Sequence, residues 1–328
     1  MQDAKNREQW RPDDSGSGCD GSRPFAANAS DMNHSTVGDQ TGGSSKEAAS
    51  HRNAGMNIRT RVEEMFPAVI GHRGAAGCAP ENTLAGLRKA KELNCRWVEL
   101  DVRLTADGQL ILLHDERLER TTNGCGKAAL LPLAAVRRFD AGHRFGDAFR
   151  GEHVPTLAEA IGVLGELGMG ANIELKAARG RGGETGAAAV ALLSQMWPPH
   201  LPPPLISSFI EEALSAARSC APSIARGLLF RAVPRNWRLR AEKLGCSTIH
   251  ADHRRLHPAL VAEICEAGYP LLTYTVNDAA RASMLFSWGV TSVFSDSPFI
   301  VCVATASTRQ PTVAASSPAG AARQGAAP

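Results

Sequence analysis

Acidic side chains alternate with apolar ones in two stretches of the sequence, VELDV at residues 98–102 and NIELK further along the chain. Glu99 and Asp101 are two residues apart, so both would lie on one face of a strand. Glu174 and Lys176 would share a face of a second strand in the same way. Carboxylates that point into a protein interior are costly unless they are paired or bind a cation. The spacing therefore predicts either a cluster of ion pairs or a metal site.

Three carboxylates without a thiol favour a hard, oxygen-preferring divalent cation such as Mg²⁺, Ca²⁺ or Mn²⁺. Zinc stays open as an alternative because two histidines are expected nearby. The ion-pair alternative is weakened by the first strand, which carries no Lys or Arg at an inward position before Arg103. Lys176 could simply pair with Glu174, or it could neutralise charge on a phosphoryl oxygen.

Two histidines stand where predicted strands end. His72 belongs to GHRGAAGCAPENT, a glycine-bounded turn, and His114 ends the run QLILLHD. Taken alone, the first is explained equally well by a solvated surface turn, and the second by a core histidine satisfied by Asp115. Together with the carboxylates, two imidazoles provide a general acid and a general base. Arg73 adds a bidentate donor for a phosphate. Jointly these residues describe a metal-dependent site that cleaves phosphodiesters.

Short β-branched runs alternate with helical patterns between residues 66 and 302. The turn TADG predicts that the run at 109–115 returns antiparallel as a hairpin. Eight strands then remain that could be parallel, which favours a (β/α)8 barrel. A doubly wound sheet is the competitor, but no glycine-rich nucleotide turn is present. The expected barrel strands are 68–72, 96–104, 170–176, 204–209, 226–230, 247–253, 271–276 and 291–296; the expected helices are 83–93, 156–167, 184–196, 210–219, 235–244, 258–267 and 278–288.

Composition narrows the class of protein. The chain has 328 residues, is 43% hydrophobic and carries a net charge of +3, which is too small to indicate nucleic-acid binding. Its eight cysteines form no CxxC pair, so neither a structural zinc site nor a disulfide framework is expected. The sequence contains neither a signal peptide nor an apolar stretch long enough for a membrane span. A cytoplasmic protein without stable membrane insertion is expected, and its oligomeric state is left open.

Three regions are expected along the chain. Residues 1–64 and 303–328 are rich in small and polar residues and are predicted to be disordered tails. Residues 65–302 are predicted to form the single folded domain. Within it, residues 116–155 lack the barrel period and are expected to form a small inserted arm after the second barrel strand.

Motifs along the whole predicted domain resemble the glycerophosphodiester phosphodiesterase family. They occur in the family's order and at similar spacing over residues 68–298. Details are most similar to the cytoplasmic bacterial members associated with glycerol-3-phosphate uptake. The motifs that carry the resemblance are HRG…PENT, ELDV, DGQLILLHDERLERTTNG, IELK, SSF, YTVND and GV..VFSD.P.

This resemblance implies a barrel enzyme that splits glycerophosphodiesters, which are deacylated phospholipids such as glycerophosphocholine or glycerophosphoethanolamine, into sn-glycerol 3-phosphate and an alcohol. It further implies roles for individual residues. Glu81 and Asn82 are expected to be structural, as a helix cap and a supporting group, and Phe145 or Phe149 to wall the alcohol side or to pack the arm. The implied metal ligands are Glu99, Asp101 and Glu174, and the implied acid–base pair is His72 and His114. The implied substrate-binding residues are Arg73, Lys176 and Tyr274, and Tyr274 stands where many members carry Trp.

Two alternatives compete with this function. A barrel that only binds phosphodiesters is disfavoured, because both histidines and all three carboxylates are present. A related phosphodiesterase that acts on lysophospholipids needs an apolar channel or a membrane-facing patch. The predicted arm is polar, with NGCGK and GHRFGD, and this favours a small, soluble substrate.

Overall fold

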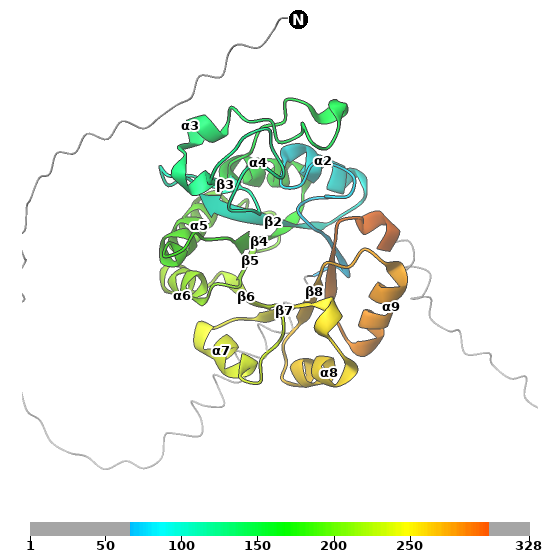
Figure 1. Cartoon of the computed structure of the whole chain (residues 1–328). Helices are drawn as coiled ribbons and strands as arrows, with labels where there is room; N and C mark the ends of the chain where they lie inside the picture. Colours follow the sequence, from blue (N-terminus) through cyan, green and yellow to red (C-terminus); the bar gives the residue numbers. More distant parts are fainter. Residues whose placement is uncertain (1–65, 302–328) are drawn as a thin grey trace, which may run out of the picture. The chain divides into compact units, whose positions relative to one another are not determined.

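A closed ring of parallel strands forms the centre of the molecule (Figure 1). The computed structural model describes residues 66–301 of the chain. Within these, nine strands form one sheet in the order β1-β9-β8-β7-β6-β5-β4-β2-β3, and an additional pairing of β1 with β2 closes it. Only β3 runs antiparallel among the described strands, against β2. The strands are β1 Val69–Gly71, β2 Trp97–Leu104, β3 Leu110–Leu112, β4 Gly170–Leu175, β5 Leu205–Ser208, β6 Ala225–Phe230, β7 Thr248–Asp252, β8 Leu271–Tyr274 and β9 Ser292–Ser295.

Helices surround this barrel and connect its strands (Figure 1). Several of these helices begin at a side chain that accepts an otherwise unsatisfied backbone N–H group. Thr83 caps α2, Thr156 and Glu159 form a complete capping box on α4, and Asp278 caps α9. The (β/α)8 barrel predicted from the alternating pattern is thus confirmed. The barrel helices are α2 Leu84–Glu92, α4 Leu157–Leu167, α5 Gly182–Met196, α6 Glu211–Cys220, α7 Trp237–Leu244, α8 Pro258–Glu266 and α9 Ala279–Trp288.

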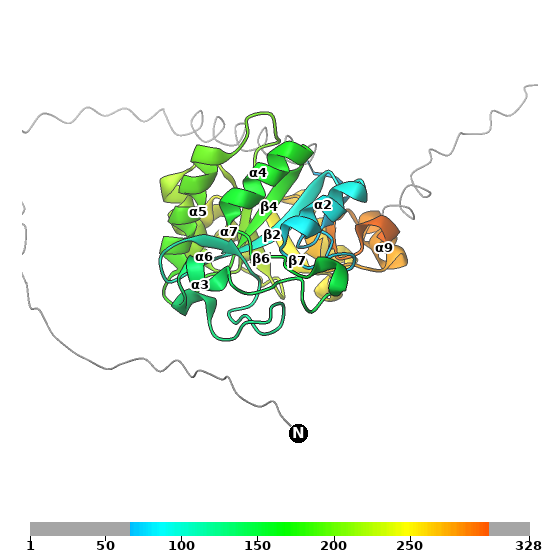
Figure 2. The ribbon, with the colours of Figure 1, turned by 90° about the horizontal axis from the view of Figure 1, so that it is seen from above.

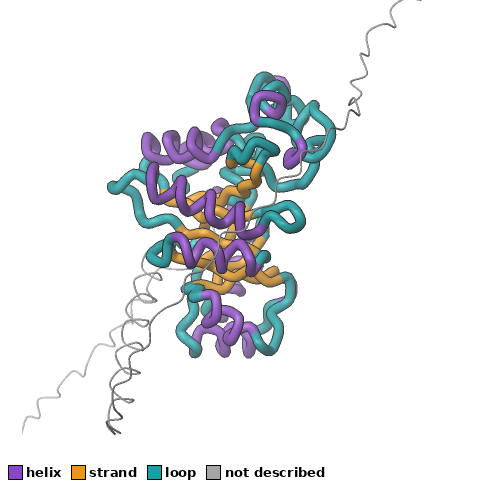
Figure 3. The backbone as a smooth tube through the Cα atoms, turned by 90° about the vertical axis from the view of Figure 1, so that its left-hand side faces the viewer, coloured by secondary structure: helices purple, strands orange, loops and turns teal. Residues whose placement is uncertain are grey.

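The helices lie outside the strands (Figure 3). Because side chains alternate along each strand, one apolar layer packs between strands and helices and another lies inside the barrel. Val98, Leu100 and Val102 of β2 pack outward into the layer beneath the helices. The barrel interior has an apolar floor, and above it the inward positions of β2 and β4 become polar. That floor consists of Phe66, Ile70, Trp97, Leu205, Leu272 and Phe294.

The segment after β3 forms the expected arm, with α3 Leu133–Val136 and two short 3-10 helices, η1 Ala128–Leu130 and η2 Asp147–Phe149 (Figure 2). It has a hydrophobic cluster of its own, which includes Leu118 and Val136 and packs on Ile111 and Leu113. The arm is therefore a packed extension of the β2–β3 hairpin.

None of the helices in the described part of the chain combines the length and hydrophobicity that crossing a bilayer requires. The predicted tails, residues 1–64 and 303–328, lie outside the described residues. The limits of the folded domain at 65 and 302 therefore stay a prediction.

Candidate active site

A cavity of about 640 Å³ opens at the carboxyl-terminal ends of the barrel strands. Barrel enzymes build their sites at this end because the strand-to-helix loops converge there. Seven of the eight predicted site residues line the cavity, and the eighth, Asp101, contacts two of them, Arg73 and Lys176. The structure therefore brings together all eight predicted site residues.

The three carboxylates come from adjacent strands. Asp101 of β2 is the register partner of Glu174 of β4, and Glu99 lies one inward position earlier. One oxygen from each of the three lies within 4.8 Å of the others. Glu99 Oε1 is buried without a hydrogen-bond partner, and Asp101 Oδ1 and Glu174 Oε1 have only ion-pair contacts, both with Lys176 Nζ. Such convergent, unsatisfied oxygens fit a hard divalent cation.

Neighbouring cations compensate the negative charge of this cluster only in part. Burial, and then the charges of Asp101 and Glu174, raise the pKa of Glu99 well above its usual range. Burial raises the pKa of Glu174 to about 7, although Lys176 acts in the opposite direction. Burial also acts to raise the pKa of Asp101, but Lys176 and Arg73 lower it below its usual value. A bound cation would stabilise all three in the ionised form.

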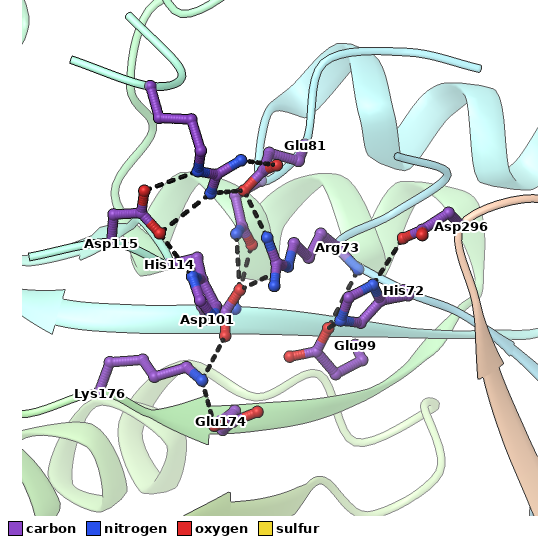
Figure 4. A network of polar contacts seen from close by, with 12 residues as sticks. His72, Arg73, Glu81, Glu99, Asp101, His114, Asp115, Glu174, Lys176 and Asp296 are labelled. Carbon is purple, nitrogen blue, oxygen red and sulfur yellow. Dashed lines mark hydrogen bonds and ion pairs between the residues drawn. The ribbon is translucent and has the colours of Figure 1, made fainter. Parts of the chain in front are cut away.

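Each histidine is held at Nδ1 by an aspartate (Figure 4). His72 Nδ1 lies 2.6 Å from Asp296 Oδ1, and His114 Nδ1 lies 2.7 Å from Asp115 Oδ1. A carboxylate can only accept, so each Nδ1 donates and each Nε2 is left for chemistry. His72 Nε2 lies 3.8 Å from Glu99 Oε2. Burial lowers the pKa of His114, against the charge of Asp101, which favours its neutral form.

Two cations border the carboxylates. Arg73 Nε lies 3.3 Å from Asp101 Oδ2, and Lys176 Nζ lies 3.4 Å from Asp101 Oδ1. Asn82 holds the same aspartate from both sides, because its amide donates to Asp101 Oδ2 at 2.9 Å and its oxygen accepts from the Asp101 backbone at 3.0 Å. The ion pairs that the sequence allowed as an alternative to a metal site are thus present. The cluster also contains the unsatisfied oxygens that suit a metal ion.

The loop between β1 and α2 shapes the site around Glu99. The backbone N–H of Arg73 donates to Glu99 Oε2 at 3.0 Å. Arg73 and Asn82 adopt φ values of 51° and 55°, a region that residues other than glycine rarely occupy. Such backbone strain is typical of functional loops. The expected cap at Glu81 is wrong: Thr83 caps α2, and Glu81 instead accepts hydrogen bonds from two arginines.

Gly71 is where this loop leaves the strand. A Cβ atom there would lie 2.1 Å from the backbone oxygen of Gly74, which cannot move without displacing the loop. We expect Gly71→Ala to lower the free energy of unfolding by about 1–3 kcal/mol and to reduce activity by displacing His72. Urea denaturation and kinetics measure both effects. Gly162→Ala is the control, since a Cβ atom there meets nothing within 4 Å in the helix; equal behaviour of the two variants would contradict the steric reading of Gly71.

Tyr274 lines the cavity with its ring, while its hydroxyl donates to the Phe230 carbonyl at 2.8 Å. Phe145 and Phe149 of the arm do not form the wall on the alcohol side that was one of the two roles expected for them. Phe145 and Phe149 pack edge-to-face with centroids 5.3 Å apart, and neither is among the residues that line the cavity. Packing of the arm is the reading that the structure favours.

Sequence reasoning missed much of the far wall of the cavity and one supporting group, Asp296. Asp296 belongs to the motif GV..VFSD.P and follows the last barrel strand, at the end of the barrel where site residues converge. The basic run at 253–255 belongs to none of the motifs that indicated the site, yet its Arg254 borders the cavity. The missed lining residues are Arg103, Phe209, Leu229, Arg231, His250, Asp252 and Arg254.

Comparison with known proteins gives a consistent result. The model of the glycerophosphoryl diester phosphodiesterase family matches residues 72–299. A glycerophosphodiester phosphodiesterase of Caldanaerobacter subterraneus is 32% identical over 232 residues, which cover 70% of this chain and 94% of the relative. One of Bacillus subtilis is 34% identical over 246 residues, covering 70% of this chain and 83% of the relative.

Solved structures share the fold. An Oleispira antarctica phosphodiesterase, solved in complex with the product sn-glycerol-3-phosphate, is 43% identical, with a TM-score of 0.72 and coverage of 74% of this chain and 98% of that one. A glycerophosphodiester phosphodiesterase of Agrobacterium tumefaciens is 29% identical, with a TM-score of 0.63 and coverage of 73% and 100%. In each case the chain spans nearly the full length of the solved protein.

Proposed function

The chain belongs to the glycerophosphoryl diester phosphodiesterase family, and from this premise we propose that it hydrolyses small glycerophosphodiesters to sn-glycerol 3-phosphate and an alcohol. We propose that a divalent cation and two histidines carry out the catalysis. It is a phosphoric diester hydrolase by family. The substrate class, the cation and the residue roles are the proposal. The Oleispira antarctica phosphodiesterase binds sn-glycerol-3-phosphate as its product, which supports the proposed product here.

One observation carries the proposal: three converging carboxylates lie beside two aspartate-held histidines in a single cavity. Glu99, Asp101 and Glu174 would hold Mg²⁺, Ca²⁺ or Mn²⁺, ions that prefer oxygen ligands. When bound, such a cation supplies Lewis-acid stabilisation of phosphate charge and lowers the pKa of an attacking hydroxyl group or water.

The protein's own side chains perform the remaining steps. Arg73 presents a planar fork to non-bridging phosphate oxygens, and Lys176 adds a point charge that can follow the charge as it develops. One imidazole removes the proton from the attacking water or from the substrate's 2-hydroxyl, and the other protonates the leaving alkoxide. Attack by the 2-hydroxyl would give a cyclic phosphate, which water must then open to yield sn-glycerol 3-phosphate. Both Nε2 atoms are prepared for this because Asp296 and Asp115 hold the opposite ring nitrogens. Tyr274 offers its aromatic face to the glycerol side.

The character of the cavity favours a small polar substrate over a lysophospholipid. Its far wall carries Arg231, Asp252 and Arg254, and an acyl chain lying against this wall would meet charged groups. Apolar contributions such as Phe209 and Leu229 are single side chains between polar ones. A diester whose two alcohols are both polar suits this lining better.

We expect the enzyme to cleave glycerophosphocholine and glycerophosphoethanolamine with added Mg²⁺, Ca²⁺ or Mn²⁺, and to cleave lysophosphatidylcholine at least about tenfold less efficiently, a difference of ~1.4 kcal/mol in transition-state binding. Coupled detection of released sn-glycerol 3-phosphate, compared with released choline, measures both the products and the preference. Faster cleavage of the lysophospholipid would overturn the proposed substrate class, and full activity after exhaustive EDTA treatment would overturn the proposed cation.

We also propose that residues 65–302 act as one catalytic domain, with the arm at 116–155 as part of it, and that the protein works in the cytoplasm on a small-molecule substrate without nucleic acid. The family model, which matches residues 72–299, supports the extent of that domain.

A further inference from the structure

A chain of charged groups runs behind the cavity and joins the inserted arm to the site (Figure 4). At one end, Arg73 Nη1 donates to Glu81 Oε1 at 2.8 Å. At the other end, His114 donates to Asp115. The guanidinium of Arg120, a residue of the arm, lies between these two carboxylates and contacts both.

Arg120 uses all three of its nitrogens in this contact. Nη1 and Nη2 donate to the two oxygens of Glu81 at 2.6 and 2.7 Å. Nε and Nη2 donate to the two oxygens of Asp115 at 2.6 and 3.1 Å. Such paired forks fix a carboxylate in direction as well as in position, which a lysine ammonium cannot do.

We propose that Arg120 is a positioning residue for catalysis: it orients Asp115 and Glu81, and through them His114 and Arg73. This inference rests on the roles proposed above for His114 and Arg73. Arg120 does not line the cavity, so its effect must pass through the two carboxylates.

Electrostatics support this arrangement. The hydrogen bond from Arg120 is the main cause that lowers the pKa of Asp115 to about 2. Burial acts to raise the pKa of Glu81, but the bond from Arg120 and the charge of Arg73 lower it overall. Both carboxylates thus stay acceptors, so His114 keeps its Nδ1 proton in the bond to Asp115 and leaves Nε2 for catalysis.

The arm acquires a role through this contact. Two of the four groups that Arg120 links, Arg73 and Glu81, come from the loop after β1, and the other two follow β3. Arg120 therefore sets the distance between a phosphate-binding arginine and an acid–base histidine that belong to different loops. A residue that only fastened the arm would alter stability without altering turnover at saturating substrate.

The test compares three substitutions in the arm by kcat, KM and melting temperature on glycerophosphocholine. We expect Arg120→Gln to lower kcat by about 10- to 100-fold, the range typical of residues that orient active-site groups, with a smaller change in KM and a nearly unchanged melting temperature. Arg120→Lys keeps the charge without the forks and should recover only part of this loss. Arg117→Gln is the matched control, because Arg117 is an exposed arm residue that pairs with Glu119 alone, and it should behave as wild type.

A double-mutant cycle identifies the route of the effect. If Arg120 acts through Asp115, then Arg120→Gln combined with Asp115→Asn should lose far less than the product of the two single losses. If Arg120→Gln keeps the wild-type kcat while His114→Ala loses activity, this inference is overturned and the proposed function is left intact. Multiplicative losses would overturn it as well, as would a change in KM alone. Wild-type turnover of His114→Ala would overturn the proposed role of that histidine, and this inference with it.

Discussion

Alanine in place of His72 or His114 should lower kcat by about 10²–10⁴-fold, the range that general acid–base groups contribute. The reason is geometric as well as chemical, since each imidazole is held at Nδ1 by an aspartate. The third histidine of the cavity lining, His250, is a poor substitute because burial lowers its pKa to about 3. Steady-state kinetics on glycerophosphocholine at saturating metal measures the loss.

His143→Ala is the control for this pair, because His143 is an exposed residue of the arm away from the cavity. All three variants should melt near the wild-type temperature, which separates lost chemistry from lost folding. Turnover at the wild-type rate in either cavity variant would remove that histidine from the acid–base pair.

The second large effect concerns the carboxylates. Glu174→Gln keeps the shape of the side chain and removes one negative charge from the triad, so it should weaken divalent-cation binding. A metal ion contributes several kcal/mol to stabilising transition-state charge, and its loss corresponds to a fall in kcat on the order of 10²-fold or more at limiting metal. Calorimetric titration with Mg²⁺, Ca²⁺ and Mn²⁺, paired with kcat as a function of metal concentration, measures both effects.

Asp252→Asn provides the comparison for Glu174→Gln. Asp252 lines the same cavity, but it pairs with Arg254 and lies outside the triad, so the variant should keep the wild-type metal affinity. The proposed ligand set would be refuted if Glu174→Gln bound the cation as tightly as wild type.

Much of the fold followed from local physical signals. The period of two in VELDV and NIELK correctly placed Glu99, Asp101 and Glu174 on inward faces, because strand geometry fixes this alternation. The Asp107–Gly108 turn correctly set the strand after it antiparallel. The helix expected from residue 156 does begin there, and Thr156 and Glu159 form a full capping box at its start. Each of these signals lies within a few residues, where sequence spacing and spatial distance are nearly equivalent.

Contacts between distant loops could not be predicted in this way. His72 and Asp296 are 224 residues apart and meet only because β1 and β9 are neighbours in the ring. Arg120 sits in a recognisable motif, RTTNG, yet its link to Glu81 depends on how the arm packs against the loop after β1. Glu81 was assigned to the helix cap because only its position near α2 was visible in the sequence. Spacing identified the candidate groups, and tertiary packing decided their partners.

The pairing of the first and last strands also sets when the enzyme can first work. On the ribosome, His72 is synthesised long before Asp296, the carboxylate 224 residues later that fixes its ring. Until β9 inserts between β8 and β1, this histidine lacks the Asp296 carboxylate that accepts from its Nδ1, and the seam of the barrel stays open. A nascent or truncated chain can therefore carry all three carboxylates of the proposed metal site and still lack one of the two aspartates that hold the histidines. If His72 has the acid–base role proposed above, hydrolysis requires the last barrel strand and therefore reports on the closed barrel.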